Sequence, residues 1–356
     1  MLRLVTPRVL ARALVPTLVQ ANHLSIGAAP RYLSYTGTSP EQDQAVKSSL
    51  EGWRRAIQSQ TTKSRDTADL NKVRQLLLVL PKLSDASSRV TSSPGFIEKH
   101  SSEDILSLSS GASVPLGTEL VLFNPLLSES TLGTDGTERR FGPPGGLDQR
   151  MWTSGSFEFE QGAQLRVGQE VECEVAVENV VPKEGAKTGL MVLVTRKLVY
   201  KADMGTVLTE RRTHVYRKQM PADQRKYIPP PADTTPKTTE VEAKQSDFGF
   251  DYYATRAALF RYSAATFNAH RIHLDPEYCR NEEGHPATLL LNLVACAARA
   301  FSSQVKKFEY RATSPLTVEQ RIRLRGAWEG GDKKKALLWA LNEAGTVCMT
   351  AKATLL

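Results

Sequence analysis

The sequence predicts an α+β fold in which antiparallel sheets wrap around a central helix. Between residues 287 and 301, apolar side chains cover nearly the whole circumference of a predicted helix, so that helix must be buried. Strand-like segments that can bury it follow directly in the sequence, at 308–312, 318–326, 335–342 and 346–355. A second series of long strands earlier in the chain predicts a second sheet.

That earlier series begins at Met151-Trp152 and 155–159. It continues with a segment in which apolar residues alternate with glutamate and alanine, the period of a half-buried strand. Two more long strand patterns follow, at 190–200 and 207–217, and the three predict a curved antiparallel meander. A central helix followed by antiparallel strands is the hot-dog arrangement. The chain therefore predicts a double hot dog, whose N-terminal half has a weak or degenerate helix. The alternating apolar positions are Val171, Cys173, Val175 and Val177.

The remaining segments predict two helices, a loop and a short strand. Helical spacing runs over 39–58 and again over 66–80, where Pro81 ends it. A serine-rich loop at 84–113 follows, and 120–123 has the composition of a strand. We expect these regions: a helical and serine-rich N-terminal region at 36–116, an N-terminal hot-dog half at 117–217, a proline-rich linker at 218–247 and a catalytic C-terminal half at 248–356.

The first 35 residues differ from the rest. They carry four arginines among alternating leucine, valine and alanine, and the first acidic residue is Glu41. This composition is typical of a mitochondrial transit peptide, and a disordered tail is the alternative. The segment predicts a protein of the mitochondrial matrix.

Charge and cysteine usage narrow the function classes. The formal net charge is +8, and about +4 without the four N-terminal arginines, with no long basic block. Nucleic-acid binding is therefore poorly supported, whereas a CoA phosphate or an acidic carrier protein suits a mildly basic surface. No apolar run is long enough for a membrane span. The widely spaced cysteines are expected to be small core residues: Cys173, Cys279, Cys296 and Cys348.

The candidate site lies at 260–275, just upstream of the predicted buried helix. Three of the six histidines fall between Asn268 and His285, namely His270, His273 and His285 itself. A histidine such as His273 can take a proton from water and return it, and an asparagine five residues earlier can orient that water. In the alternative interpretation Asn268 is a turn residue and the histidines are surface polar groups.

Other chemistries find less support. A metal site would need His270, His273, Cys279 and His285 at irregular spacing, so none is predicted. The sequence contains no G-x-S-x-G, no GxxxxGK loop and no GxGxxG after a strand. Serine hydrolysis, nucleotide hydrolysis and nicotinamide chemistry therefore lack their usual signals.

Several segments together resemble the mitochondrial hydroxyacyl-thioester dehydratase type 2 branch of the MaoC-like family. The longest is FRYSAATFNAHRIH at 260–273, and the resemblance extends from about Thr67 to the C-terminus. The others are LVLFNPLL at 120–127, RMW at 150–152, LRVG at 165–168 and FEYRA at 308–312.

The resemblance implies a double hot dog that removes water from a 3-hydroxyacyl thioester. It places Asn268 where related hydratases carry an aspartate, as water holder, and His273 at the catalytic histidine. His270, Arg271 and Tyr262 are implied as substrate-binding or supporting residues. No cofactor is implied, because the thioester already acidifies the C2 proton. The implied partners are an acyl carrier protein or CoA thioester, in mitochondrial type II fatty acid synthesis, and a homodimer is one assembly it allows.

The sequence departs from the family pattern after His285-Pro286. The family has a glycine-containing segment there, whose backbone amides would hold the thioester carbonyl, and this chain passes directly to Ala287. Two other functions therefore stay open. One is a CoA-specific enoyl- or dicarboxylyl-CoA hydratase, and the other is a non-catalytic acyl-binding or scaffold subunit.

Overall fold

The computed structural model describes residues 40–80, 102–114, 117–185, 189–203, 205–219, 246–283 and 305–356. The predicted transit peptide, most of the predicted linker and the predicted central helix at 287–301 lie outside the described residues. His285 and Cys296 lie outside them as well.

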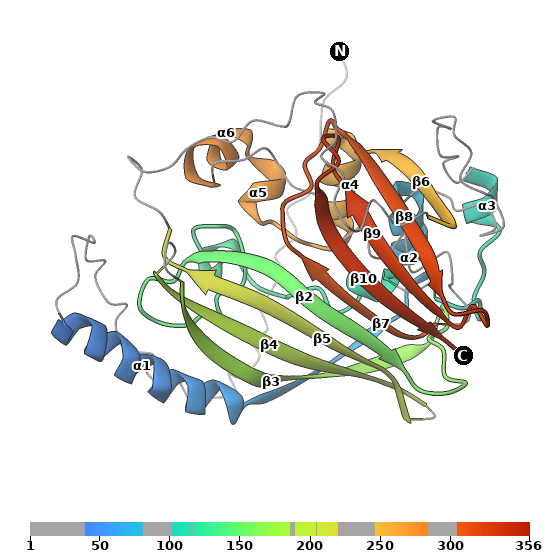
Figure 1. Ribbon diagram of the computed structural model, residues 1–356. Helices are drawn as coiled ribbons and strands as arrows, with labels where there is room; N and C mark the ends of the chain where they lie inside the picture. The colour runs from blue at the N-terminus through green and yellow to red at the C-terminus, as the bar shows by residue number, and fades with distance from the viewer. Residues whose placement is uncertain are drawn as a thin grey trace, which may run out of the picture. The chain divides into compact units, whose positions relative to one another are not determined.

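The described strands form one antiparallel sheet of ten strands, in the order β1-β3-β4-β5-β2-β7-β10-β9-β8-β6 (Figure 1). Strands β2 and β7 join its two parts, with Ser154 opposite Arg311 and Glu158 opposite Lys307. The first part consists of β1 (Thr61–Thr67), β2 (Gln149–Phe159), β3 (Glu170–Gly185), β4 (Gly189–Ala202) and β5 (Gly205–Arg217). The second consists of β6 (Phe248–Tyr253), β7 (Val305–Ala312), β8 (Arg321–Glu329), β9 (Lys335–Leu341) and β10 (Val347–Leu355).

The strand predictions are largely confirmed. The meander β3-β4-β5 pairs neighbour to neighbour, and β7 to β10 occupy the four segments predicted after the central helix. Strands β1 and β6 were not predicted. Both are short edge strands of the sheet, and β1 is almost wholly polar, so neither carries a strong periodic signal.

Two helices match the predicted patterns. Helix α1 spans Pro40–Gln58, and α2 spans Leu70–Val79 after Asp69, whose side chain accepts a hydrogen bond from the Lys72 amide. The start of the second pattern is different, because Asp66 belongs to β1. Its carboxylate accepts hydrogen bonds from Lys72 Nζ and from the Phe123 amide, which ties the strand to the helix and the following loop.

The strand predicted at 120–123 is wrong. Thr118–Val121 form the 3-10 helix η1 instead. Gly117 enters it with a φ of 87°, and its amide donates to Glu119 Oε2 at 2.8 Å. Val121 and Leu122 are both buried. The apolar run at 120–123 therefore reflects packing in the core and does not mark a strand.

Two apolar clusters on the sheet matter for the site. The larger, which we call the main cluster, runs across β2-β7 and includes Leu198, Leu208 and Phe308. The second, the α1 cluster, contains Val194 and Tyr216 with residues of α1 and of the loop before β2. Cys173, Cys279 and Cys348 are buried free thiols, which confirms the core role predicted for them. Within the described part of the chain, no helix is long and apolar enough to cross a membrane.

Candidate active site

Helix α4 (Arg256–Ala265) leads into the candidate site. Thr255 caps its start, accepting a hydrogen bond from the Ala258 amide at 3.1 Å. After the helix, Phe267 takes a positive φ of 50°, and the Asn268 amide donates to the Ser263 carbonyl at 2.8 Å. The chain therefore reverses direction tightly after the helix, and residues 268–273 follow this turn.

Asn268 is part of this reversal. Its Oδ1 accepts a hydrogen bond from the His270 amide at 3.1 Å, the geometry of a turn-forming asparagine. The turn role considered from the sequence is thus present in the structure. The same bond fixes the orientation of the carboxamide, whose nitrogen is hydrogen-bonded to no other described residue.

The next two histidines face each other at the short helix α5 (Arg271–Leu274). His270 is the residue before the helix, and His273 lies in it. Their ring centroids are 5.8 Å apart and their planes are nearly perpendicular, at 84°. His270 is 5% exposed, whereas His273 is only half-buried. His273 is therefore the more accessible of the two imidazoles.

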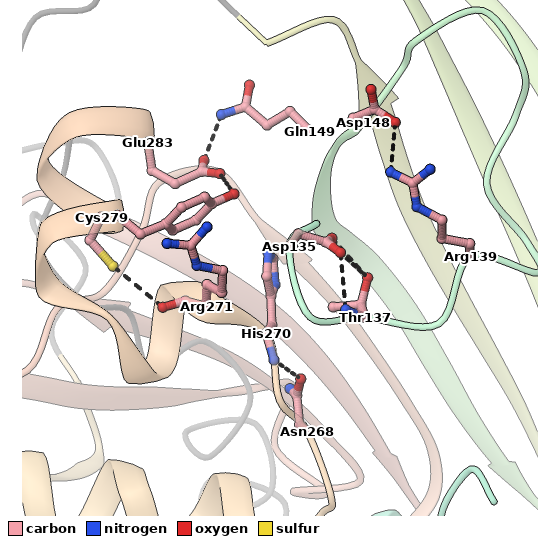
Figure 2. A network of polar contacts seen from close by, with 11 residues as sticks. Asp135, Thr137, Arg139, Asp148, Gln149, Asn268, His270, Arg271, Cys279 and Glu283 are labelled. Carbon is pink, nitrogen blue, oxygen red and sulfur yellow. Dashed lines mark hydrogen bonds and ion pairs between the residues drawn. The ribbon is translucent and has the colours of Figure 1, made fainter. Parts of the chain in front are cut away.

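A carboxylate from a distant part of the sequence stands beside His270. Asp135 lies in the loop between the turn η2 (Glu129–Thr131) and β2, and its Oδ2 is 3.8 Å from His270 Nε2 (Figure 2). Thr137 fixes that carboxylate, since its hydroxyl donates at 2.9 and 2.7 Å to the two oxygens and its amide donates at 3.0 Å. The carboxylate is therefore held in a fixed position beside the His270 ring.

The backbone locks the two segments together. The Arg271 amide donates to the Asp135 carbonyl at 2.8 Å. Gly136 has a φ of 79°, and a Cβ on it would lie 2.2 Å from the Ala269 carbonyl oxygen. Only glycine permits this approach, so the loop before β2 and the histidine turn form one rigid unit.

The other two residues predicted for the site have different surroundings. Arg271 is exposed; its guanidinium donates to Asp275 at 2.7 Å and lies 4.3 Å from the centroid of the Tyr278 ring. Tyr262 is buried on α4 in the main cluster. The structure thus brings Asn268, His270, Arg271 and His273 into one turn of chain, and Tyr262 lies on the helix that precedes it.

A second buried histidine lies under the site. His214 on β5 is 3% exposed and its ring centroid is 5.1 Å from that of Trp152. Burial, together with Arg150, Arg196, Arg212 and the more distant His270, holds the pKa of His214 well below its ordinary value of 6.5. His214 is therefore neutral at physiological pH.

Cys279 has a structural role. Its thiol donates to the Ile272 carbonyl at 3.2 Å, and burial raises its pKa to about 12. No cluster of three or more histidine, cysteine, aspartate or glutamate side chains suited to a metal ion occurs among the residues that the structure describes.

Sequence reasoning missed Asp135, Thr137 and His214. Asp135 and Gly136 stand in a glycine-rich segment that turn propensities alone predict, so no periodic signal marks them. His214 alternates with apolar residues along β5 like any core position. The only available signal was the acidic residue directly before a glycine in a loop of otherwise ordinary turn composition.

The fold is a double hot dog like that of the MaoC-like dehydratases. Two solved structures show the fold. A MaoC-like dehydratase from Phytophthora capsici superposes with a TM-score of 0.58 at 15% identity, covering 85% of this chain and 97% of that one. HtdX of Mycobacterium tuberculosis gives a TM-score of 0.53 at 16% identity, over 83% of this chain and 100% of that one.

The family is narrower than the class. Residues 117–318 match the family described as hydroxyacyl-thioester dehydratase type 2, and the chain belongs to it. Mesaconyl-C(4)-CoA hydratase of Chloroflexus aurantiacus is 29% identical over 205 residues, 54% of this chain and 68% of that protein. The mitochondrial hydroxyacyl-thioester dehydratase type 2 of Schizosaccharomyces pombe is 26% identical over 234 residues, 58% of this chain and 76% of that protein. The predicted family, and with it the hydro-lyase class of enzyme, are confirmed.

Proposed function

We propose that the chain catalyses the reversible dehydration of a 3-hydroxyacyl thioester to the trans-2-enoyl thioester. In this reaction a base takes a proton from C2, the C3–O bond breaks as the leaving hydroxyl receives that proton to form water, and a C2–C3 double bond forms. The observation that carries the proposal is the histidine pair of His270 and His273, backed by the Asp135 carboxylate, in a member of this family.

The roles follow from exposure and hydrogen bonding. His273 is the acid and base, because it is the more accessible imidazole and can reach a substrate. Asn268 holds the water through its carboxamide, which the turn already orients. His270 and Arg271 support this arrangement. His270 does so through its contact with the Asp135 carboxylate, and Arg271 through the hydrogen bond that its backbone N–H donates to the Asp135 carbonyl.

No metal or organic cofactor is required for this step. The thioester carbonyl already acidifies the C2 proton, and hydrogen-bond donors that stabilise the enolate oxygen supply the remaining effect. In the family, such donors come from the segment after the histidine-proline pair. The corresponding part of this chain, around His285, lies outside the described residues.

The proposed setting is the mitochondrial matrix, with acyl carrier protein as the carrier in type II fatty acid synthesis. Two observations support it. The first 35 residues have the composition of a transit peptide, and one relative, from Schizosaccharomyces pombe, is named as mitochondrial.

The test is turnover of a short enoyl thioester by the purified chain, followed as loss of enoyl-thioester absorbance. We expect turnover, a loss of about 10²- to 10⁴-fold in kcat for His273→Ala, and a smaller loss for His270→Ala. The exposed Arg261→Gln on α4 is the matched control and should retain activity. A folded protein that turns over no thioester would contradict the proposal.

A CoA-specific hydratase for an enoyl or dicarboxylic acyl group is the second candidate. It is favoured by the relative from Chloroflexus aurantiacus, which is named as a mesaconyl-C(4)-CoA hydratase. Comparing kcat/KM for the same acyl group on acyl carrier protein and on CoA separates the two candidates. Binding of the thioester without turnover would instead favour the non-catalytic acyl-binding or scaffold subunit.

A further inference from the structure

A row of arginines crosses one face of the first part of the sheet. Arg212 on β5 is paired with Arg196 on β4, and directly paired residues of antiparallel strands point to the same face. Tyr216, further along β5 on that face, is paired with Arg150 on β2. We call this set the arginine strip: Arg150, Arg196 and Arg212.

The strip lies between two apolar clusters. On one side, Val194 and Tyr216 belong to the α1 cluster. On the other, Leu198 and Leu208 belong to the main cluster. Guanidinium groups between two apolar clusters are costly to desolvate unless each finds a partner, so their pairing is informative.

Within the arginine strip, Arg212 alone has a carboxylate partner among the residues that the structure describes. Its guanidinium donates through Nε and Nη2 to the two oxygens of Glu210, the second at 2.7 Å, and Glu210 is fully buried. Tyr200 also donates its hydroxyl to Glu210, at 2.7 Å. Both oxygens of the Glu210 carboxylate therefore already accept hydrogen bonds from Arg212.

Arg150 and Arg196 have no such partner. Neither forms an ion pair with any residue that the structure describes, and the buried Nε of Arg196 has no acceptor there. The Arg196 guanidinium lies 4.6 Å from the centroid of the Phe141 ring, and Glu138 acts on it through space without an ion pair. Burial lowers the pKa of Arg196 to about 10. Arg150 and Arg196 are each half-buried as whole residues.

The strip borders the candidate active site. His214 lies on the same face, between the rows of Arg212 and Arg150, and both those arginines and His270 affect its pKa. Phe141, which packs on Arg196, belongs to the same loop as Asp135. A substrate held at His270 and His273 is therefore near Arg150 and Arg196.

We propose that Arg150 and Arg196 bind an anionic oxygen group of the thioester substrate. Guanidinium groups match the planar fork of a carboxylate and the oxygens of a phosphate. The anion comes either from a carboxylate on the acyl chain or from a phosphate of the carrier. The inference rests on the proposed thioester chemistry and names the feature of the substrate that the site selects.

The experiment compares three thioesters with the full chain: crotonyl-CoA, (E)-glutaconyl-CoA, which adds a terminal carboxylate, and crotonyl-pantetheine, which lacks phosphate. If the anion is an acyl carboxylate, Arg150→Gln and Arg196→Gln should each raise KM for glutaconyl-CoA at least tenfold, with crotonyl-CoA changed less than threefold. If it is a carrier phosphate, KM should rise for both CoA thioesters and stay unchanged for crotonyl-pantetheine.

Arg211→Gln is the matched control, because Arg211 neighbours Arg212 on β5 but pairs with Glu178 on the other face. It should leave all three KM values unchanged, and Arg196→Lys should restore part of the loss in Arg196→Gln. Unchanged KM values in both glutamine variants, or the same rise for all three thioesters, would overturn the proposal.

Thermal unfolding separates this proposal from the proposed reaction. Glutarate or inorganic phosphate should raise the Tm of the wild-type chain more than uncharged glutaramide does, and Arg196→Gln should lose that difference. This readout requires no turnover, so it tests the anion site even if no thioester is hydrated. If the variants do not fold, equal Tm shifts with glutarate, phosphate and glutaramide in the wild type would overturn the proposal.

Discussion

Asp135 Oδ2 lies 3.8 Å from His270 Nε2, although the two residues are 135 positions apart in the sequence. Asp135 precedes β2, and His270 lies between β6 and β7. The first part of the chain therefore contributes a charge directly to the candidate site. We propose that Asp135 positions the His270 imidazole, because its contact is to His270 and the more accessible imidazole is that of His273.

Replacing Asp135 by asparagine should lower kcat for thioester hydration by about 10- to 100-fold and leave KM within about threefold. The charge beside His270 is lost, while the Thr137 bonds to Oδ1 can remain. Steady-state kinetics on the variant checks this. Thr137→Val, which keeps the charge and loses only the hydroxyl bonds, should have a smaller effect on kcat. An unchanged kcat in Asp135→Asn would show that the carboxylate only holds the loop.

Gly136→Ala should destabilise the protein by more than Gly162→Ala. Both glycines have positive φ, 79° and 75°, so both substitutions strain the backbone, at about 1 kcal/mol each. Only Gly136 also approaches another segment, with a Cβ position 2.2 Å from the Ala269 carbonyl oxygen, whereas nothing lies within 4 Å at Gly162. Denaturant unfolding measures the difference, and kcat should fall only in Gly136→Ala. Equal losses would mean that the contact with Ala269 relaxes without cost.

The raised pKa of Glu119 should make the free energy of unfolding of the protein fall as pH rises. Burial, aided by the charge of Glu210, raises its pKa from 4.5 to about 8, and its Oε1 has no partner among the described residues. The folded state therefore holds a proton that the unfolded state releases between pH 4.5 and 8. The contribution to stability is full below pH 4.5 and is lost as pH rises through 8.

Glu119→Gln should remove this dependence, which amounts to several kcal/mol across the window. Urea unfolding between pH 5 and 8.5 measures it, with the exposed Glu160→Gln as control. The wild type and the control should lose stability toward alkaline pH in parallel, and Glu119→Gln should lose much less. A Glu119→Gln curve parallel to the wild type would contradict the assignment.

The buried thiols should resist alkylation in the native state. Burial raises the pKa of Cys173 and Cys279 to about 12 and that of Cys348 to about 11, so almost no thiolate is present at pH 8. Iodoacetamide treatment at pH 8 followed by peptide mass spectrometry should find all three unmodified until denaturant is added. Rapid native labelling of Cys279 would mean that the segment after α5 opens.

Local sequence patterns predicted most of the strands and the histidine turn. Alternation such as Val171, Cys173 and Val175 fixes which face of β3 is buried, and that signal is local. The five-residue spacing of Asn268 and His273 is local too, so the candidate acid-base group was predictable. The strand prediction at 120–123 was wrong because a short run of apolar residues is expected both for a buried strand and for the buried 3-10 turn that forms there.

The surroundings of the histidines could not be predicted from local patterns, because they come from distant parts of the sequence. In the sequence, Asp135 and Gly136 have the composition of an ordinary turn. Their contacts with Ala269 and His270 appear only in the folded structure. The arginines at 150, 196 and 212 stand on three strands, and strand pairing alone places them on one face. Contacts between charged groups and between backbones of distant segments produce no periodic pattern in the sequence, because they form only when the strands pair.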